Sequence, residues 1–156
     1  METTNTLACM QVAEIELIYK SKVKASDRPK VTTSRDAFKL FKSNWDDNKI
    51  EFVEQFKVLF LNRANSVLGL FELSTGGVTG TVADPKLVFM AALKLNACNI
   101  ILCHNHPSGN LKPSRADELL TQKIKEAGTY LDLPVIDHLI ISAEDSYYSF
   151  ADEGLL

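Results

Sequence analysis

The sequence predicts a mixed α/β domain in which a central sheet is flanked by helices. Short apolar runs typical of buried strands alternate with amphipathic stretches of helical periodicity, and glycine or proline punctuates the connections between them. The hydrophobic content of 46% is enough for a real core, and 156 residues suit a single compact domain. We expect the elements in the order β-α-β-β-β-α-β-α-β-β.

The first half of the chain is expected to hold strands around one helix. That helix opens at Ser34 and has Phe38 and Phe41 on its apolar face, with Trp45 near its end. The other expected elements are a half-buried strand over 11–20, a turn over 46–49, a hairpin of strands 56–61 and 67–73, and a short strand over 78–82 after a glycine-rich bend.

The second half alternates helices with strands. Asp84 is expected to cap a helix that has Pro85 in its first turn and runs to about Ala97. The remaining elements are a buried central strand over 99–103, a helix from Ser114 to about Leu131, and strands over 135–142 and 147–150. We expect residues 1–48 to be an N-terminal strand-helix extension of a domain over 49–156, the two forming one compact unit.

Charge and composition exclude several classes of protein. The net charge of −3 gives no global basic field for nucleic acid, so DNA binding would need a local patch such as the basic residues between Lys20 and Lys30. No apolar run is long enough for a membrane span, and the first residues do not resemble a signal peptide. Cys9, Cys98 and Cys103 form no CxxC pair and suggest reduced thiols in a cytoplasmic protein.

A divalent-metal site is expected where the central strand ends. His104 and His106 are two residues apart, so in extended geometry both imidazoles face the same side. An irregular loop then returns Asp117 in the first turn of the next helix. Two histidines and one carboxylate are the usual protein ligands of a catalytic zinc, with a fourth position open for water.

Other interpretations of the same residues stay open. Ser114 and Asp117 also fit a helix capping box, which needs no metal. Non-haem iron oxygenases use the same ligand types, although this compact order is less usual for them. The sequence has neither HExxH nor HxE with PCxxC, which argues against zincins and zinc nucleobase deaminases.

The segment resembles a known family. His104-Asn-His106-Pro107, six residues, and Ser114-x-x-Asp117 match the JAMM (MPN+) metalloprotease motif HxHPx(6)SxxD. The string HNHPSGNLKPSRADELLT, followed by DHLII and YYSFADEGLL, is similar to the RadC-like branch of that superfamily over about residues 50–156. The resemblance implies a JAMM-type sheet packed between helices, in a layered architecture like that of cytidine deaminases, and one zinc ion per chain.

The resemblance also implies residue roles. His104, His106 and Asp117 would be the zinc ligands, and Ser114 would help to stabilise the oxyanion of a tetrahedral intermediate. JAMM enzymes use an upstream glutamate as general base, which in this branch leads a strand in an ExF pattern. That pattern indicates Glu54, with Glu51 as the second choice. For either glutamate, an exposed carboxylate at a strand edge is the plain alternative.

Three functional hypotheses follow from the sequence. The first is a zinc metallopeptidase or isopeptidase that cleaves a peptide or isopeptide bond with a zinc-activated water. The second is a DNA-repair-associated protein that binds or hydrolyses DNA, although the segment before the domain lacks the helix-hairpin-helix motif that longer RadC-like proteins carry. The third is a non-catalytic interaction module with a vestigial metal site. Substrate and oligomeric state are not encoded in any motif.

Three further residues are expected to be structural. His138, on a later strand, is interpreted as a hydrogen-bonded core histidine in preference to a ligand. Cys103 and Asn105 alternate with the histidines along the strand and should therefore face its other side, Cys103 as a buried thiol.

Overall fold

A five-stranded mixed sheet forms the centre of the computed structural model, which describes residues 12–16, 18–76 and 82–156. The strand order is β2-β1-β3-β4-β5, and only β3 and β4 run parallel to each other. The strands are β1 (Gln55–Leu61), β2 (Val67–Thr75), β3 (Asn99–Asn105), β4 (Val135–Ile141) and β5 (Tyr147–Ser149).

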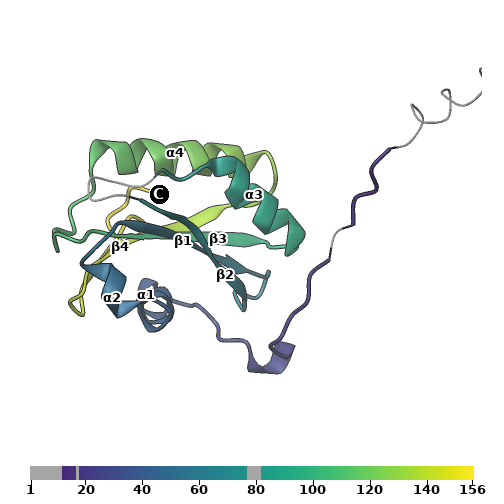
Figure 1. Ribbon diagram of the computed structural model, residues 1–156, viewed down its shortest axis with the longest axis horizontal. Coiled ribbons are helices and arrows are strands. Elements are labelled where there is room, and N and C mark those ends of the chain that lie inside the picture. Colours follow the sequence, from purple (N-terminus) through teal and green to yellow (C-terminus); the bar gives the residue numbers. More distant parts are fainter. Residues whose placement is uncertain (1–11, 17, 77–81) are drawn as a thin grey trace, which may run out of the picture.

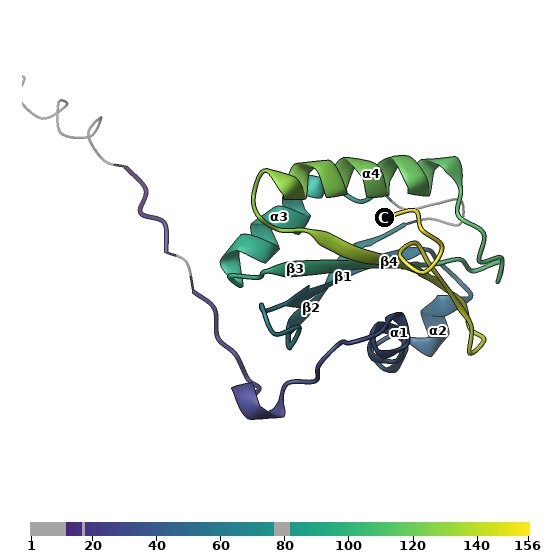
Figure 2. The ribbon, with the colours of Figure 1, turned by 180° about the vertical axis from the view of Figure 1, so that it is seen from behind.

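Helices cover both faces of the sheet. As Figures 1 and 2 show, α1 (Ser34–Ser43) and α2 (Asp47–Ile50) lie on one face, and α3 (Pro85–Lys94) and α4 (Arg115–Thr129) lie on the other. A short 3₁₀ helix, η2 (Ala25–Asp27), precedes them. The sequence-based prediction of a mixed sheet flanked by helices is therefore confirmed.

Two apolar cores hold these layers together, one on each face of the sheet. Alternation along β3 supplies both, since Ile101 and Cys103 pack toward α1 whereas Ile100 and Leu102 pack toward α3 and α4. On the α1 face, Phe38 and Phe41 are fully buried. All seven residues of β3 except Asn99 are buried, so this central strand is a rigid base for a functional site.

Helix α4 begins at a rigid N-terminus. The Ser114 side chain accepts a hydrogen bond from the N–H of Asp117, and the Asp117 side chain accepts one from the N–H of Ser114, so the capping box predicted from the sequence is present. The predicted starts of α3 and α4 are confirmed, although each helix ends two or three residues earlier than expected, at Lys94 and Thr129.

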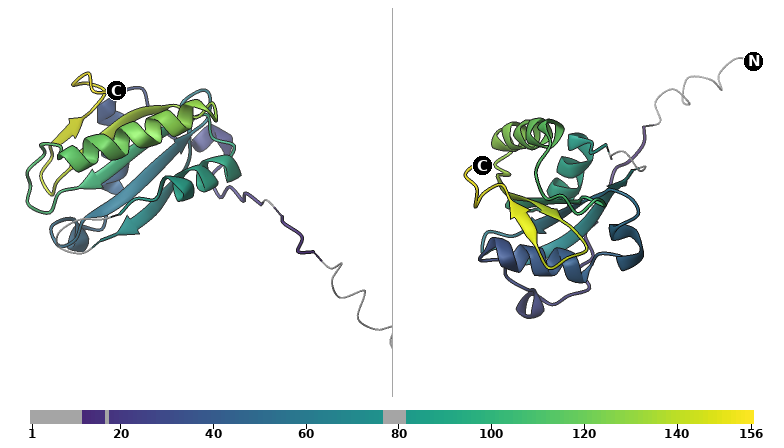
Figure 3. Two further views of the ribbon diagram at one scale, coloured as in Figure 1. Left: turned by 90° about the horizontal axis from the view of Figure 1, so that it is seen from above. Right: turned by 90° about the vertical axis from the view of Figure 1, so that its left-hand side faces the viewer.

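Two expectations for the first half were wrong. Residues 12–16 and 18–20 form no strand and lead away from the sheet (Figures 1 and 3), with Val12 and Ile15 each 88% exposed. An alternating segment becomes a strand only where a sheet edge accepts its backbone hydrogen bonds. Among the described residues of this segment, only Tyr19 bonds to the edge strand, through its hydroxyl, which donates to the Leu68 carbonyl. The turn expected over 46–49 instead contains the single helical turn α2, which Asp46 caps and Ile50 anchors in the core.

The strand expected over 78–82 lies almost wholly outside the described residues. Within the part of the chain that the structure describes, no helix has the length and apolar character that crossing a membrane would require.

Candidate metal centre

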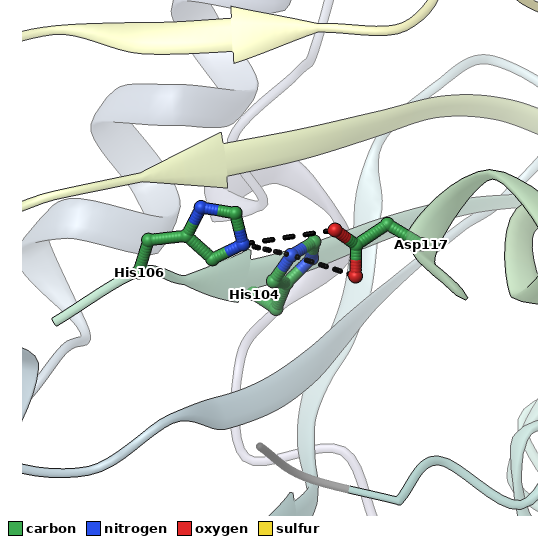
Figure 4. A group of neighbouring side chains, drawn as sticks. All are labelled: His104, His106 and Asp117. Atoms are coloured by element: carbon green, nitrogen blue, oxygen red, sulfur yellow. Dashed lines mark hydrogen bonds and ion pairs between the residues drawn. The ribbon is translucent and has the colours of Figure 1, made fainter. Parts of the chain in front are cut away.

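The two histidines and the aspartate predicted as ligands come together at the end of β3. His104 is the next-to-last residue of β3, and His106 follows the strand while its N–H still donates to the Ile141 carbonyl of β4. Asp117 reaches the pair from the first turn of α4. Figure 4 shows the two rings and the carboxylate turned toward one another. Each residue offers one ligand atom, and these atoms all lie within 4.8 Å of one another, so the group could hold a metal ion.

The spacing of the donor atoms suits a small tetrahedral cation. Nε2 of His104 lies 3.0 Å from Nε2 of His106 and 3.4 Å from Oδ1 of Asp117, and Nε2 of His106 lies 3.7 Å from Oδ2 of Asp117. Ligand atoms about 2.0–2.2 Å from a tetrahedral zinc are separated by about 3.3–3.6 Å. The separations of His104 Nε2 from His106 and from Oδ1 of Asp117 lie close to this range, the 3.7 Å separation of His106 is to the other carboxylate oxygen, and the residue types fit the ion.

The loop after His106 fixes which nitrogen this ring presents. Gly109 adopts a φ of +78°, a conformation that favours glycine, and its N–H donates to the His106 carbonyl. The loop thereby returns the Asn110 carbonyl to within 2.5 Å of His106 Nδ1. Because a carbonyl only accepts, Nδ1 carries the proton and donates, and the Nε2 lone pair of a neutral His106 faces the other ligands.

Asp117 is held in the ionised form and in one orientation. Its Oδ2 accepts hydrogen bonds from the Ser114 N–H at 2.7 Å and the Ser114 hydroxyl at 2.6 Å. Burial alone would raise the pKa of the Asp117 carboxyl, but contacts with His104, His106 and Ser114 outweigh it and keep that pKa well below its usual range. Conversely, the Asp117 carboxylate raises the pKa of His106, and the charge of Glu54 adds to the effect. Because both hydrogen bonds from Ser114 go to Oδ2, the other oxygen of Asp117, Oδ1, remains available as a ligand atom.

His138 lies behind His104 and has no exposed surface. Its Nε2 is 2.8 Å from Nδ1 of His104, and its Nδ1 is 2.6 Å from the Thr121 hydroxyl of α4. Burial lowers the pKa of His138 well below its ordinary value. The expectation of a buried, hydrogen-bonded core histidine is confirmed. Sequence reasoning missed its contact with a ligand, and it missed Thr121 altogether, although Thr121 follows Asp117 by one helical turn and so shares its face of α4.

The two candidate bases differ in their surroundings. Glu54 is half-buried and lines an open hollow with His106, Ser108, Lys112 and Ser114, whereas the exposed Glu51 ends α2 and is not among the residues that line this hollow. The geometry brings Glu54, and not Glu51, to the same hollow as a ligand and the predicted oxyanion donor. The catalytic roles of Glu54 and Ser114 stay predictions.

The far side of β3 agrees with the predicted alternation. Cys103 is a fully buried free thiol whose pKa burial raises, and Asn105 faces away from the ligands toward the α2–β1 connection. Cys98 is also free, and Cys9 lies outside the described residues. Among the described residues, His104, His106 and Asp117 form the one group of this kind able to hold a metal ion.

Comparison of the sequence with known proteins identifies the family of this chain. A model of the RadC-like JAB domain matches residues 31–155. A UPF0758 protein of Flavobacterium johnsoniae is 49% identical over 126 residues, 81% of this chain and 53% of that protein. One of Porphyromonas gingivalis is 42% identical over 129 residues, 83% of this chain and 56% of that protein. The chain thus spans about half the length of these curated relatives. The family model covers the whole sheet, helices α1 to α4 and all three candidate ligands, and the chain therefore belongs to the RadC-like JAB domain family.

Proposed function

We propose that this protein is a zinc-dependent hydrolase that cleaves a peptide or isopeptide bond with a metal-activated water. The observation that carries the proposal is the meeting of three ligand residues, whose ligand atoms lie within 4.8 Å of one another, with Glu54 and Ser114 beside one open hollow. Three protein ligands leave a fourth position for water, as in catalytic zinc sites. A bound zinc ion lowers the pKa of its water toward ~7 and polarises the scissile carbonyl.

Glu54 is the group available to move the proton. It is the acidic side chain that lines the hollow beside His106, from the segment just before β1. In this proposal Glu54 takes the proton of the attacking water and returns it to the leaving amine, a general acid–base role worth ~10²–10⁴ in rate. Lys112 lines the same hollow.

Ser114 is the proposed donor to the oxyanion. In the structure its hydroxyl donates to Oδ2 of Asp117, which also accepts from the Ser114 N–H. The hydroxyl can therefore turn to an oxyanion while the N–H keeps Asp117 in place. Single oxyanion donors contribute roughly 3–4 kcal/mol to catalysis.

The small number of carboxylate ligands favours hydrolysis of a peptide bond over hydrolysis of a phosphodiester. Nucleases commonly use two metal ions about 4 Å apart, which requires further carboxylates. Within the described residues the metal-ligand group holds the single carboxylate Asp117. The free thiols Cys98 and Cys103 support the further proposal that the protein works in the cytoplasm.

The test combines metal analysis with matched glutamate variants. Purified protein should contain close to one zinc per chain and should cleave members of a quenched-fluorescence library of linear and Nε-lysine-linked peptides. Glu54→Gln and His106→Ala should abolish cleavage, and Glu51→Gln should retain it. If both Glu54→Gln and His106→Ala cleave as well as the wild type, the mechanism is wrong. Cleavage of DNA, lost in the same variants, would replace the peptide substrate by a phosphodiester, and absence of metal would favour a non-catalytic module.

A further inference from the structure

A series of hydrogen bonds joins two candidate ligands through residues that are not ligands. His104 contacts His138, His138 contacts the Thr121 hydroxyl, and that hydroxyl contacts the backbone carbonyl of Asp117 at 2.6 Å. These bonds link β3, β4 and α4. Because Thr121 follows Asp117 by one helical turn, any shift of its hydroxyl is coupled to the start of α4, where Asp117 lies.

The direction of each hydrogen bond in this series follows from one acceptor, the backbone carbonyl oxygen of Asp117. This oxygen only accepts, so the single hydroxyl proton of Thr121 is donated to it. The Thr121 oxygen must then accept from Nδ1 of His138, 2.6 Å away. A neutral His138 with its proton on Nδ1 has a lone pair on Nε2, and that lone pair faces Nδ1 of His104 at 2.8 Å.

The consequence reaches the metal site. Nδ1 of His104 must be the donor to His138, which leaves the lone pair of His104 on Nε2. That nitrogen points to Nε2 of His106 at 3.0 Å and to Asp117 Oδ1 at 3.4 Å. Two nitrogen lone pairs and a carboxylate then converge, and their mutual repulsion is relieved by a cation. The opposite tautomer of His104 would put an N–H where the cation binds.

We propose that Thr121 and His138 are positioning residues that fix the tautomer of His104 and thereby set the metal affinity of the centre. The inference rests on the proposed metal site, but not on the substrate or on turnover. Packing supports it, because the His138 ring stacks on Phe150 with centroids 4.7 Å apart, and Phe56 lies against both His104 and His138. The two rings are therefore held in one orientation, as outer partners of metal-binding histidines usually are.

Nitrogen-15 NMR of the metal-free protein, labelled in its imidazole nitrogens, tests the tautomers directly. The chain has three histidines, so a spectrum of tag-free protein is readily assigned with one variant for each. We expect His104 and His138 both to carry their proton on Nδ1 at neutral pH, a form less common in free histidine. A proton on Nε2 of either ring would overturn the inference whatever the metal affinity.

Substitution of Thr121 tests the effect on affinity. Thr121→Val keeps the shape and loses the hydroxyl, and Thr121→Ser keeps the hydroxyl. Thr129→Val is the matched control, since Thr129 lies in the same helix and donates to the Lys125 carbonyl four residues before it, away from the site. Zinc affinity is measured by competition with a chromophoric chelator, and the absorption bands of bound cobalt report the geometry of the ligands.

The results separate a positioning role from a structural one. Thr121→Val should bind zinc about 10–100 times more weakly and shift the cobalt bands, Thr121→Ser should restore most of the affinity, and Thr129→Val should match the wild type. A merely structural role would lower the stability of the metal-free Thr121→Val protein and leave its zinc affinity unchanged, which overturns the inference alone. If the wild type binds no zinc, the proposed function fails together with it.

Discussion

The backbone N–H of Gln55 donates a 2.7 Å hydrogen bond to Oδ1 of Asn105, and both residues are completely buried. The Nδ2 group of Asn105 donates to the carbonyls of Ile50 and Val53 at 2.7 and 2.9 Å. These bonds bracket Glu54, whose own carbonyl accepts from the N–H of Gly76. Because Asn105 stands between His104 and His106 in the sequence, the segment that carries Glu54 is tied directly to the strand that leads to both histidines.

Replacing Asn105 should destabilise the fold. Asn105→Ala leaves two carbonyls and one N–H without their partner in a buried place, and we expect a loss of about 2–3 kcal/mol in the free energy of unfolding. Asn48→Ala is the control, since Asn48 is exposed and its side chain bonds only to Asp46. Urea unfolding measures both. A loss below about 0.5 kcal/mol in Asn105→Ala would mean that water replaces the side chain at no cost.

Ser114→Ala should lower turnover more than it lowers zinc binding. The variant loses the hydroxyl proposed for the oxyanion but keeps the Ser114 N–H bond to Asp117. At zinc concentrations that saturate each protein, we expect kcat to fall by roughly 10²–10³. Ser108→Ala, in the same hollow, should change kcat little. Equal effects of the two substitutions would remove Ser114 from the proposed mechanism.

Metal binding should raise the thermal stability of the protein. An ion that binds only the folded state stabilises it by RT ln(1 + [L]/Kd), about 2.7 kcal/mol at a concentration 100 times Kd. For a domain of this size the increase in Tm is about 5–10 °C. Differential scanning calorimetry with zinc and with a chelator measures it. His106→Ala should show no such increase, and a zinc-induced shift that survives in this variant would place the bound ion elsewhere.

Acid should weaken the start of α1 through Asp36. The Thr32 side chain, followed by the N–H groups of Thr32 and Thr33, donates to the Asp36 carboxylate and lowers its pKa from 3.8 to about 2. A carboxyl whose pKa is lower in the folded than in the unfolded state stabilises the fold above pH 3.8 and loses that contribution as the pH falls toward 2. The stability advantage of the wild type over Asp36→Asn should therefore shrink between pH 4.5 and 2.5 in urea unfolding. An advantage that is constant over this range would contradict the assignment.

Much of the site could be predicted because its determinants are local. The alternation of strand side chains is enough to put His104 and His106 on one face and Cys103 and Asn105 on the other. The capping box is likewise a property of four consecutive residues, Ser114 to Asp117, and it sets where Asp117 lies. Local rules of this kind hold here because the buried strand β3 and the capped helix α4 leave the backbone few alternatives.

The rest depends on which elements become neighbours. His138 contacts His104 because β4 pairs in parallel with β3, and it contacts Thr121 because α4 packs against the same face of these strands. The spacing of residues in the sequence predicts neither the strand pairing nor the position of the helix. The strand expected over 11–20 failed for the same reason. Its alternating pattern favours a strand, but the described part of the segment pairs with no strand of the sheet.

Consecutive side chains of strand β3 pack into the two layers on opposite faces of the sheet. The number of residues in this strand therefore matters more for the metal site than the identity of most of them. Inserting or deleting one residue between Asn99 and Cys103 would turn Asn105 toward α4 and the histidines toward the α2–β1 connection, so the metal site and the support for Glu54 would be lost in one step. Apolar exchanges such as Ile for Val at position 100 or 101 would preserve both. In a library of variants, this stretch should accept conservative substitutions and reject insertions or deletions of a single residue.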